Sequence, residues 1–218
     1  MLNSIIIRIL LIVSFFFFGY NIVFIILYKK RHKKNEDTNK ENNFLNEIRV
    51  FARLGIHIIN IFIFLVCLNI FLYDYWLLVF PRINLGILSD VTQIIGFTLI
   101  IGGNISLLLA YRKLGVYWNY PIDGTSKKKK LVKTGIYGRI RHPIYLSFNI
   151  FCIGFNLLLL DWFLLILYVI GSIGLYIQAI DEEKILLRHF GEEYAEYMEK
   201  TGRFFIKLKK NSRKKIKI

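Results

Sequence analysis

The chain is poor in the residues from which disulfide frameworks and zinc sites are built. Its 218 residues include only two cysteines, Cys67 and Cys152, and both lie inside apolar stretches. Their spacing fits neither kind of site, and a buried cysteine commonly serves as a small hydrophobic residue. The chain also lacks a G-x-G-x-x-G motif between a strand and a helix. We therefore expect neither a metal site nor a Rossmann-type nucleotide-binding fingerprint.

Acidic residues are scarce compared with basic ones. The chain has 15 Asp and Glu against 30 Lys and Arg, which gives a formal net charge of +15. Such an excess is typical of nucleic-acid-binding proteins and also of proteins that lie against anionic lipid headgroups. No surface of combined aromatic and basic residues accompanies the charge, so we expect membrane lipids as partners and no nucleic acid.

Long apolar stretches dominate the rest of the sequence, and 55% of all residues are hydrophobic. About 20 apolar residues in a helix cross a hydrocarbon core of roughly 30 Å. Three stretches of this kind are residues 5–28, 55–73 and 87–111. A fourth region, residues 143–178, is too long for one span and is divided by Asp161, which predicts a helical hairpin that turns at Asp161–Trp162. The sequence thus predicts an all-α integral membrane protein with about five transmembrane helices, followed by two short interfacial helices.

The basic residues predict how these helices are oriented. Of the 30 Lys and Arg, 28 fall in residues 29–53, 112–141 and 181–218. Because Lys and Arg are enriched in cytoplasmic loops, five spans with the N-terminus outside would place all three segments in the cytoplasm. The first apolar stretch has no strongly basic leader and no small-residue cleavage site, which favours a retained anchor over a signal peptide.

Polar side chains concentrate where the predicted hairpin begins. Arg141 and His142 directly precede Pro143, and Tyr137 and Tyr145 lie on either side. Proline fixes φ near −65° and lacks only an N–H that the first helical turn would leave unpaired, so a helix is expected to begin at Pro143. Two cationic or titratable side chains and two tyrosines therefore lie at the mouth of a membrane helix.

A hairpin must return to the membrane face from which it started. Glu182 and Glu183, 40 residues beyond His142 in the sequence, are therefore expected at the same depth as His142. Taken singly, these carboxylates are also typical of a solvated helix start, and Arg141 of a positive-inside anchor. Their convergence at one depth favours a shared site.

The order of these motifs resembles the isoprenylcysteine carboxyl methyltransferase family and the related phospholipid N-methyltransferases. The similar pattern covers roughly residues 110–206 and consists of Gly135-x-Tyr137-x-x-x-Arg141-His142-Pro143-x-Tyr145, the hairpin, Glu182-Glu183, and Phe190-Gly191-Glu-Glu-Tyr194-x-x-Tyr197. The resemblance implies a multi-pass membrane enzyme that uses S-adenosylmethionine without a Rossmann fold. It also implies a lipophilic small-molecule or lipidated substrate, and the basic residues predict that the active site lies at the cytoplasmic face. We accordingly expect three parts: membrane spans with a basic cytoplasmic loop (1–85), a methyltransferase-like membrane core (86–206) and a basic tail (207–218).

The resemblance also assigns roles to individual residues. Those implied to surround S-adenosylmethionine are Leu131, Val132, Tyr137, His142, Pro143, Ile144, Tyr145, Glu182, Tyr194 and Tyr197. Lys129 and Lys130 align with the start of this binding segment but differ from the family's usual residues. Gln178 stands where the carboxyl methyltransferases have an arginine that holds the substrate carboxylate. This difference leaves the acceptor open among a carboxylate, an amine, a thiol and a phenol.

Methyl transfer is an in-line displacement that needs alignment rather than a protein nucleophile. The candidate catalytic residues are Arg141, His142 and Glu183. Arg141 or His142 suits the carboxylate of the cofactor by charge-assisted hydrogen bonds. His142 or Glu183 suits the acceptance of a proton from an amine or thiol acceptor.

Two other functions fit part of the sequence. Membrane sterol reductases that use NADPH carry a similar Arg-His-Pro-x-Tyr, but with Asn at x and Gly-Glu after the Tyr. This chain has Ile144 and Leu146-Ser147 at those positions. The other alternative is a non-catalytic membrane protein that retains the fold.

Overall fold

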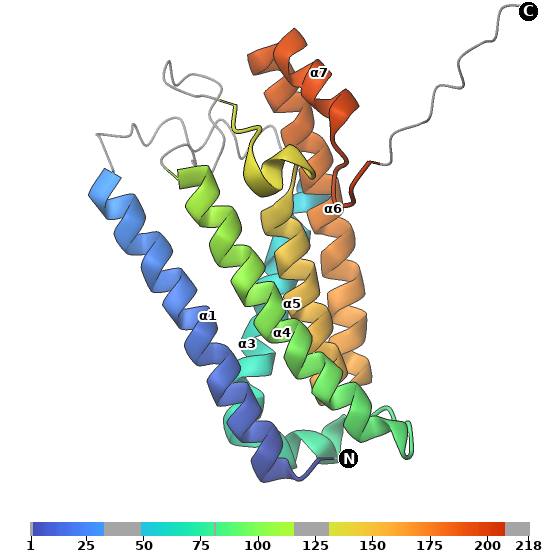
Figure 1. The fold of residues 1–218 in the computed structure, drawn as a ribbon. Coiled ribbons are helices and arrows are strands. Elements are labelled where there is room, and N and C mark those ends of the chain that lie inside the picture. The colour runs from blue at the N-terminus through green and yellow to red at the C-terminus, as the bar shows by residue number, and fades with distance from the viewer. Residues whose placement is uncertain (1, 33–48, 81, 116–130, 208–218) are drawn as a thin grey trace, which may run out of the picture.

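The computed structural model describes residues 2–32, 49–80, 82–115 and 131–207. These residues fold almost entirely into helices (Figure 1). The helices are α1 (Ser4–His32), α3 (Val50–Val79), α4 (Leu88–Leu114), the 3-10 helix η2 (Gly135–Gly138), α5 (Pro143–Leu159), α6 (Trp162–Phe190) and α7 (Glu192–Lys200). Each of the five apolar stretches in the sequence forms one long helix, which confirms the all-α membrane fold class.

The five long helices run alternately up and down in one bundle. Figure 1 shows the end of α1, the start of α3, the end of α4, the start of α5 and the end of α6 at the same end of the molecule, with η2 and α7. By length and composition, α1, α3, α4 and α6 each hold a segment that could cross a membrane. The fifth helix, α5, is also apolar but has only 17 residues. The described parts of the three basic segments lie at or near the end of the bundle that carries η2 and α7.

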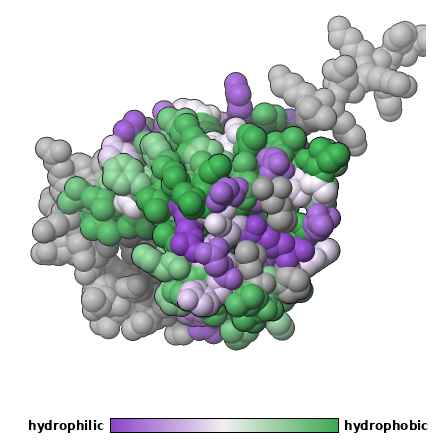
Figure 2. Space-filling model, turned by 90° about the horizontal axis from the view of Figure 1, so that it is seen from below, coloured by the Kyte–Doolittle hydropathy of each residue, from purple (hydrophilic) through white to green (hydrophobic). Residues whose placement is uncertain are grey.

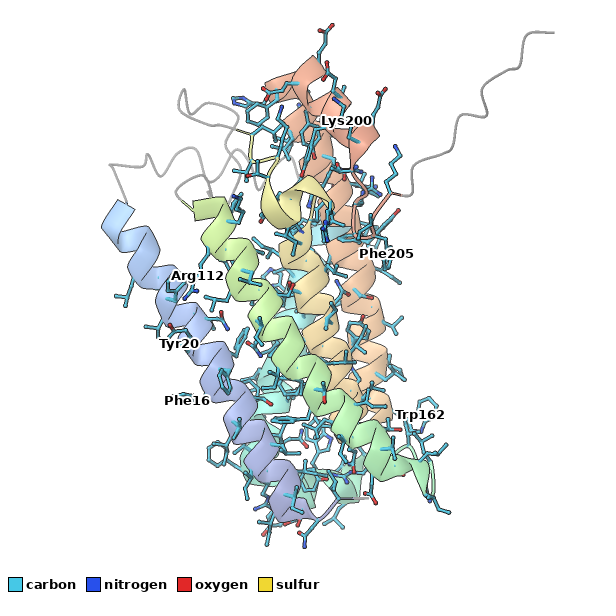
Figure 3. All side chains as sticks on the ribbon, in the orientation of Figure 1. Phe16, Tyr20, Arg112, Trp162, Lys200 and Phe205 are labelled. Atoms are coloured by element: carbon cyan, nitrogen blue, oxygen red, sulfur yellow. The ribbon has the colours of Figure 1, made fainter. Side chains whose placement is uncertain are left out.

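The outside of the bundle is apolar between its two ends. Phe16 and Tyr20 of α1 and Trp162 of α6 point outward (Figure 3) and are 75%, 52% and 53% exposed. Seen from the end where α5 joins α6, hydrophilic residues gather toward the middle, with hydrophobic residues around them (Figure 2). This distribution matches a bundle whose sides contact lipid and whose ends contact water.

The hairpin turns one residue earlier than the sequence predicts. Leu160 ends α5 in the left-handed conformation with φ of 52°, and Asp161 caps α6 by accepting the backbone N–H of Leu164 at 2.8 Å. The other carboxylate oxygen of Asp161 accepts the indole N–H of Trp76 at 2.7 Å, which ties the turn to α3. Trp162 is thus the first residue of α6 and does not belong to the turn.

Only one of the two predicted short C-terminal helices is separate. The helix α6 continues without a break through Glu182 and Glu183 to Phe190, where Gly191 ends it with φ of 54°. The prediction of a separate first interfacial helix is therefore wrong, because nothing between Gln178 and Phe190 breaks the backbone hydrogen bonding. The second predicted helix is α7.

Glycines allow two pairs of helices to approach closely. A Cβ atom on Gly55 of α3 would lie 2.3 Å from Cα of Gly174 on α6, and one on Gly96 of α4 would lie 2.6 Å from the backbone N of Leu158 on α5. Small residues at such crossings let helix backbones meet in membranes, where van der Waals packing replaces the hydrophobic effect between helices. As a result α5 packs mainly against α4, and α6 mainly against α3.

Two adjacent glycines of α4 provide a test of this packing. A Cβ atom on Gly103 would lie 2.9 Å from the backbone N of Phe151, whereas one on Gly102 would meet nothing within 4 Å. We expect Gly103→Ala to lower the free energy of unfolding by about 1–3 kcal/mol through overpacking. Gly102→Ala should be neutral or raise it by about 0.5–1 kcal/mol, since alanine is the better helix former. Thermal unfolding in detergent measures both, and equal behaviour of the two variants would contradict the α4–α5 packing.

Candidate functional site

The polar site begins with a turn that leads the chain toward α5. Gly135 has φ of 65°, a conformation that favours glycine, and the 3-10 helix η2 that follows buries Tyr137. His142 then precedes the first residue of α5, Pro143, where the sequence predicts the helix start. Pro143 thus fixes where α5 begins, and so places His142 directly before the first turn of the helix.

Glu182 of α6 faces these residues and is only 6% exposed. Its Oε1 atom accepts a short hydrogen bond from the hydroxyl of Tyr145 and a longer one, of 3.3 Å, from the side-chain amide of Gln178. Its Oε2 atom lies 3.7 Å from Nδ1 of His142. The hairpin therefore brings His142 and Glu182 together, as the sequence predicts.

Glu183 is the most heavily paired acidic residue of the site. Oε1 accepts from Nε of Arg141 at 2.8 Å and from Nε of Arg203 at 3.0 Å, and Oε2 accepts from the second nitrogen of Arg203 at 2.6 Å. Nε2 of His142 lies 3.3 Å from the same Oε1. Two guanidinium groups thus compensate a carboxylate whose side chain is 4% exposed. Such pairing is what keeps a buried carboxylate ionised.

Three buried tyrosines, Tyr137 of η2 and Tyr194 and Tyr197 of α7, also belong to the site and are here called the tyrosine wall. The hydroxyl of Tyr197 donates to the backbone carbonyl of Tyr137 at 2.6 Å. Burial raises the pKa of Tyr197 to about 12 and raises the pKa of Tyr137 and Tyr194 as well. All three therefore carry neutral hydroxyls at neutral pH and can donate hydrogen bonds.

Two of these hydroxyls are buried without a hydrogen-bond partner among the described residues. They belong to Tyr137, which is 6% exposed, and to Tyr194, which is 1% exposed. Leaving a buried polar group unpaired costs about 1–3 kcal/mol. A ligand with hydrogen-bond acceptors would remove that cost. Together with the Glu182 carboxylate, the hydroxyls fit a ligand such as S-adenosylmethionine, which carries an ammonium group, a carboxylate and ribose oxygens.

The structure gathers most of the residues that the sequence assigns to the site. Those that lie in or against the cluster are Tyr137, Arg141, His142, Pro143, Tyr145, Gln178, Glu182, Glu183, Tyr194 and Tyr197. Ile144 is half-buried in the first turn of α5, and Leu131 and Val132 are half-buried ahead of η2. Lys129 and Lys130 lie outside the described residues. Which of these side chains touch a ligand stays a prediction.

Sequence reasoning missed Arg203. It is one of eleven Lys and Arg between residues 181 and 218, which together indicate the orientation of the helices. Arg203 falls inside the predicted membrane core (86–206), yet nothing next to it in the sequence distinguishes it from the other basic residues. Arg49, which pairs with Asp181 at 3.0 Å across α3 and α6, was missed for the same reason.

Fold and site together define an all-helical membrane protein with a buried, charge-compensated polar cluster at one end. Residues 91–193 match the family model for phospholipid methyltransferase, and this segment contains most of the cluster. The chain is 33% identical over 119 residues to a protein-S-isoprenylcysteine O-methyltransferase of Xenopus laevis, which covers 53% of this chain and 41% of that protein. It is 33% identical over 129 residues to the Saccharomyces cerevisiae enzyme of the same name, covering 56% and 54%.

A solved structure of a eukaryotic intramembrane Ras methyltransferase, an isoprenylcysteine carboxyl methyltransferase, also matches. The TM-score is 0.47 at 22% identity, with 72% of this chain and 50% of that chain covered. The chain spans about half the length of the curated relatives it matches. The family match and the curated relatives confirm the resemblance to the membrane methyltransferases that the sequence motifs indicate.

The tyrosine wall provides a matched pair of variants. Tyr197→Phe removes a donor from the buried carbonyl of Tyr137 and should lower the free energy of unfolding by about 1–3 kcal/mol. Tyr194→Phe removes a hydroxyl that has no partner in the described structure, so stability without ligand should be unchanged or higher. Thermal unfolding of the ligand-free protein in detergent measures both. If Tyr194→Phe were the more damaging change, our account of the two hydroxyls would be wrong.

Proposed function

We propose that this protein transfers a methyl group from S-adenosylmethionine to a lipophilic acceptor that reaches the site through the membrane. The observation that carries the proposal is the buried Glu182 carboxylate in one cluster with the hydroxyls of Tyr137 and Tyr194, which have no hydrogen-bond partner among the described residues. These groups match the ammonium, ribose and carboxylate groups of the cofactor. The similarity to membrane methyltransferases supports the same conclusion.

The side chains of the site would bind and orient rather than react. Glu182 would pair with an ammonium group or with ribose hydroxyls, and the two tyrosine hydroxyls would donate to acceptor oxygens. Tyrosine faces would attract a sulfonium by cation–π interaction. S-adenosylmethionine, when bound, supplies an activated methyl group. Alignment then accounts for most of the rate enhancement, and the protein contributes no nucleophile.

His142 is the proposed catalytic side chain of the cluster. Its imidazole lies between Glu182 and Glu183, so one ring nitrogen can accept a proton while the other donates to a carboxylate. An amine, thiol or phenol acceptor must lose a proton, whereas a carboxylate has none to lose. Arg141 and Glu183 would act with His142 by fixing its position, because Glu183 is bound to Arg141 at 2.8 Å.

The acceptor that the relatives' names suggest is the carboxyl group of an isoprenylcysteine. We propose a lipidated or lipid-like acceptor, with Gln178 next to it. Gln178 is 1% exposed and its amide donates to Glu182 at 3.3 Å, so it is close to the carboxylate that would bind the cofactor. We infer that the site faces the cytoplasm, because 28 of the 30 Lys and Arg lie in three segments whose described parts adjoin this end of the bundle.

Calorimetry on the detergent-purified protein tests the cofactor assignment. S-adenosylmethionine should bind saturably, and Glu182→Gln should weaken binding about tenfold or more, because it removes the charge that pairs with the ligand. Glu193→Gln is the matched control, since the Glu193 side chain is 53% exposed and pairs only with Lys133 among the described residues. Binding of NADPH without any S-adenosylmethionine affinity would instead indicate a membrane reductase. Normal cofactor binding without turnover on any lipophilic acceptor would indicate a non-catalytic protein.

The chemistry of the product distinguishes the acceptor classes. Membranes that contain the protein are incubated with S-adenosylmethionine labelled in the methyl group, and the labelled lipid or protein is then treated with alkali. A methyl ester releases volatile labelled methanol, as we expect for a carboxylate acceptor, whereas N-methyl, S-methyl and aryl ether products retain the label. Retention of the label would exclude an isoprenylcysteine carboxylate as the acceptor.

A further inference from the structure

The segment Thr201–Phe204, here called the strap, crosses the start of α5. The backbone N–H of Arg141 donates to the carbonyl of Gly202 at 2.9 Å, and that of His142 donates to the carbonyl of Arg203 at 3.1 Å. A guanidinium nitrogen of Arg141 also donates to the carbonyl of Thr201. The strap therefore holds the backbone that carries the proposed catalytic histidine.

Gly202 makes this crossing possible. A Cβ atom at this position would lie 1.7 Å from the backbone carbonyl oxygen of Phe205. Phe205 itself is 80% exposed and lies at the outside of the bundle (Figure 3). The chain thus turns sharply out of the strap immediately after it has contacted His142.

The side chain of Arg203 turns inward from the strap. Two of its nitrogens bind the two oxygens of Glu183 at 3.0 and 2.6 Å, which is the bidentate geometry that favours Arg over Lys. The third nitrogen donates to the hydroxyl of Tyr176 at 3.0 Å, and the guanidinium lies 5.3 Å from the centre of that ring. Hydrogen bonding to Glu183 raises the pKa of Arg203. Glu183 and Tyr176 of α6 therefore fix this side chain. An arginine that only contacted lipid headgroups would not need two parallel hydrogen bonds to one carboxylate.

The imidazole of His142 has Tyr145, Phe204 and Glu183 as neighbours, and the strap supplies or binds two of these three. Its ring stacks on Tyr145 with centroids 5.5 Å apart, and the ring of Phe204 lies 6.0 Å away. Nε2 lies 3.3 Å from the Glu183 oxygen that Arg203 also binds. Tyr145 is thus the only one of these three neighbours that does not depend on the strap.

Both oxygens of Glu183 are paired only when the strap is in place. Arg141 binds Oε1 of Glu183, whereas Arg203 binds both Oε1 and Oε2. Oε2 of Glu183 has Arg203 as its hydrogen-bond donor within the described part of the chain. Without Arg203 that oxygen would be buried and unpaired, and Glu183 would be drawn toward His142 or out of the cluster.

We propose that Arg203 is a positioning residue, which holds Glu183 by its fork so that His142 keeps the orientation that cofactor binding and methyl transfer need. The inference rests on the proposed function and adds to it the C-terminal strap as an essential part of the site. Arg203 touches neither cofactor nor acceptor in this account and acts through Glu183 and His142.

Three variants test the proposal by calorimetry with S-adenosylmethionine and by hydrogen–deuterium exchange of the Arg141 and His142 amides. Arg203→Gln should weaken cofactor binding about tenfold or more and speed exchange of both amides. Arg203→Lys should recover part of the affinity, because one ammonium group cannot bind both oxygens in the same way. Lys200→Gln removes the same charge from a side chain that is 74% exposed and should change neither measurement.

The outcomes separate this inference from the proposed function. Failure of the unaltered protein to bind S-adenosylmethionine overturns the proposed function. Normal binding by Arg203→Gln, in a series where the unaltered protein binds, overturns only the role of Arg203. A lower melting temperature with unchanged affinity also overturns it, since that result describes a purely structural residue. If Arg203→Gln does not fold, Gly202→Ala provides the test, because displacing the strap backbone should reproduce both the weaker binding and the faster exchange.

Discussion

The site depends on one buried ionic interaction, that of the Glu183 carboxylate with the guanidinium groups of Arg141 and Arg203. A carboxylate in a poorly solvated place is stable only when it is paired and hydrogen-bonded on all sides. Glu183, on α6, meets this condition with donors from two other parts of the chain, the segment just before α5 and the strap. The pairing therefore joins segments far apart in sequence at the point where the histidine and the second glutamate face each other.

The helix packing places that interaction at the right height. At 1.5 Å per residue, the 17 residues of α5 measure about 25 Å. The antiparallel helix α6 covers the same distance in the opposite direction by about Ala179. Glu182 lies about one turn further, level with the segment that carries His142. The left-handed Leu160 and the Asp161 cap fix the register of the two helices. Glycine crossings then hold α5 on α4 and α6 on α3, which keeps the register rigid.

The polar cluster differs from a purely structural ion-pair network in one respect. Its charges are compensated, yet two tyrosine hydroxyls that face Glu182 lack partners within the described residues. A network that served only stability would gain by satisfying or removing them. The match of residues 91–193 to phospholipid methyltransferases covers most of this cluster, including Tyr137, Glu182 and Glu183. The strap and two of the three wall tyrosines, Tyr194 and Tyr197, follow α6, so the end of the described chain contributes to the site together with the motif at residues 135–145.

The sequence by itself determined the helices and the region of the site. Three signals were sufficient to predict the five long helices and the hairpin: the apolar stretches of membrane length, Asp161 between two of them, and the proline after His142. These signals are local, and helix formation depends on neighbouring residues. The hairpin then implied that His142 and Glu182 meet. Only the tertiary structure showed that α6 continues past Gln178, that Arg203 turns inward, and that Glu183 is bound by two arginines. A basic residue has the same local sequence signal whether it faces headgroups or a buried carboxylate, and only the packing of distant segments decides between them.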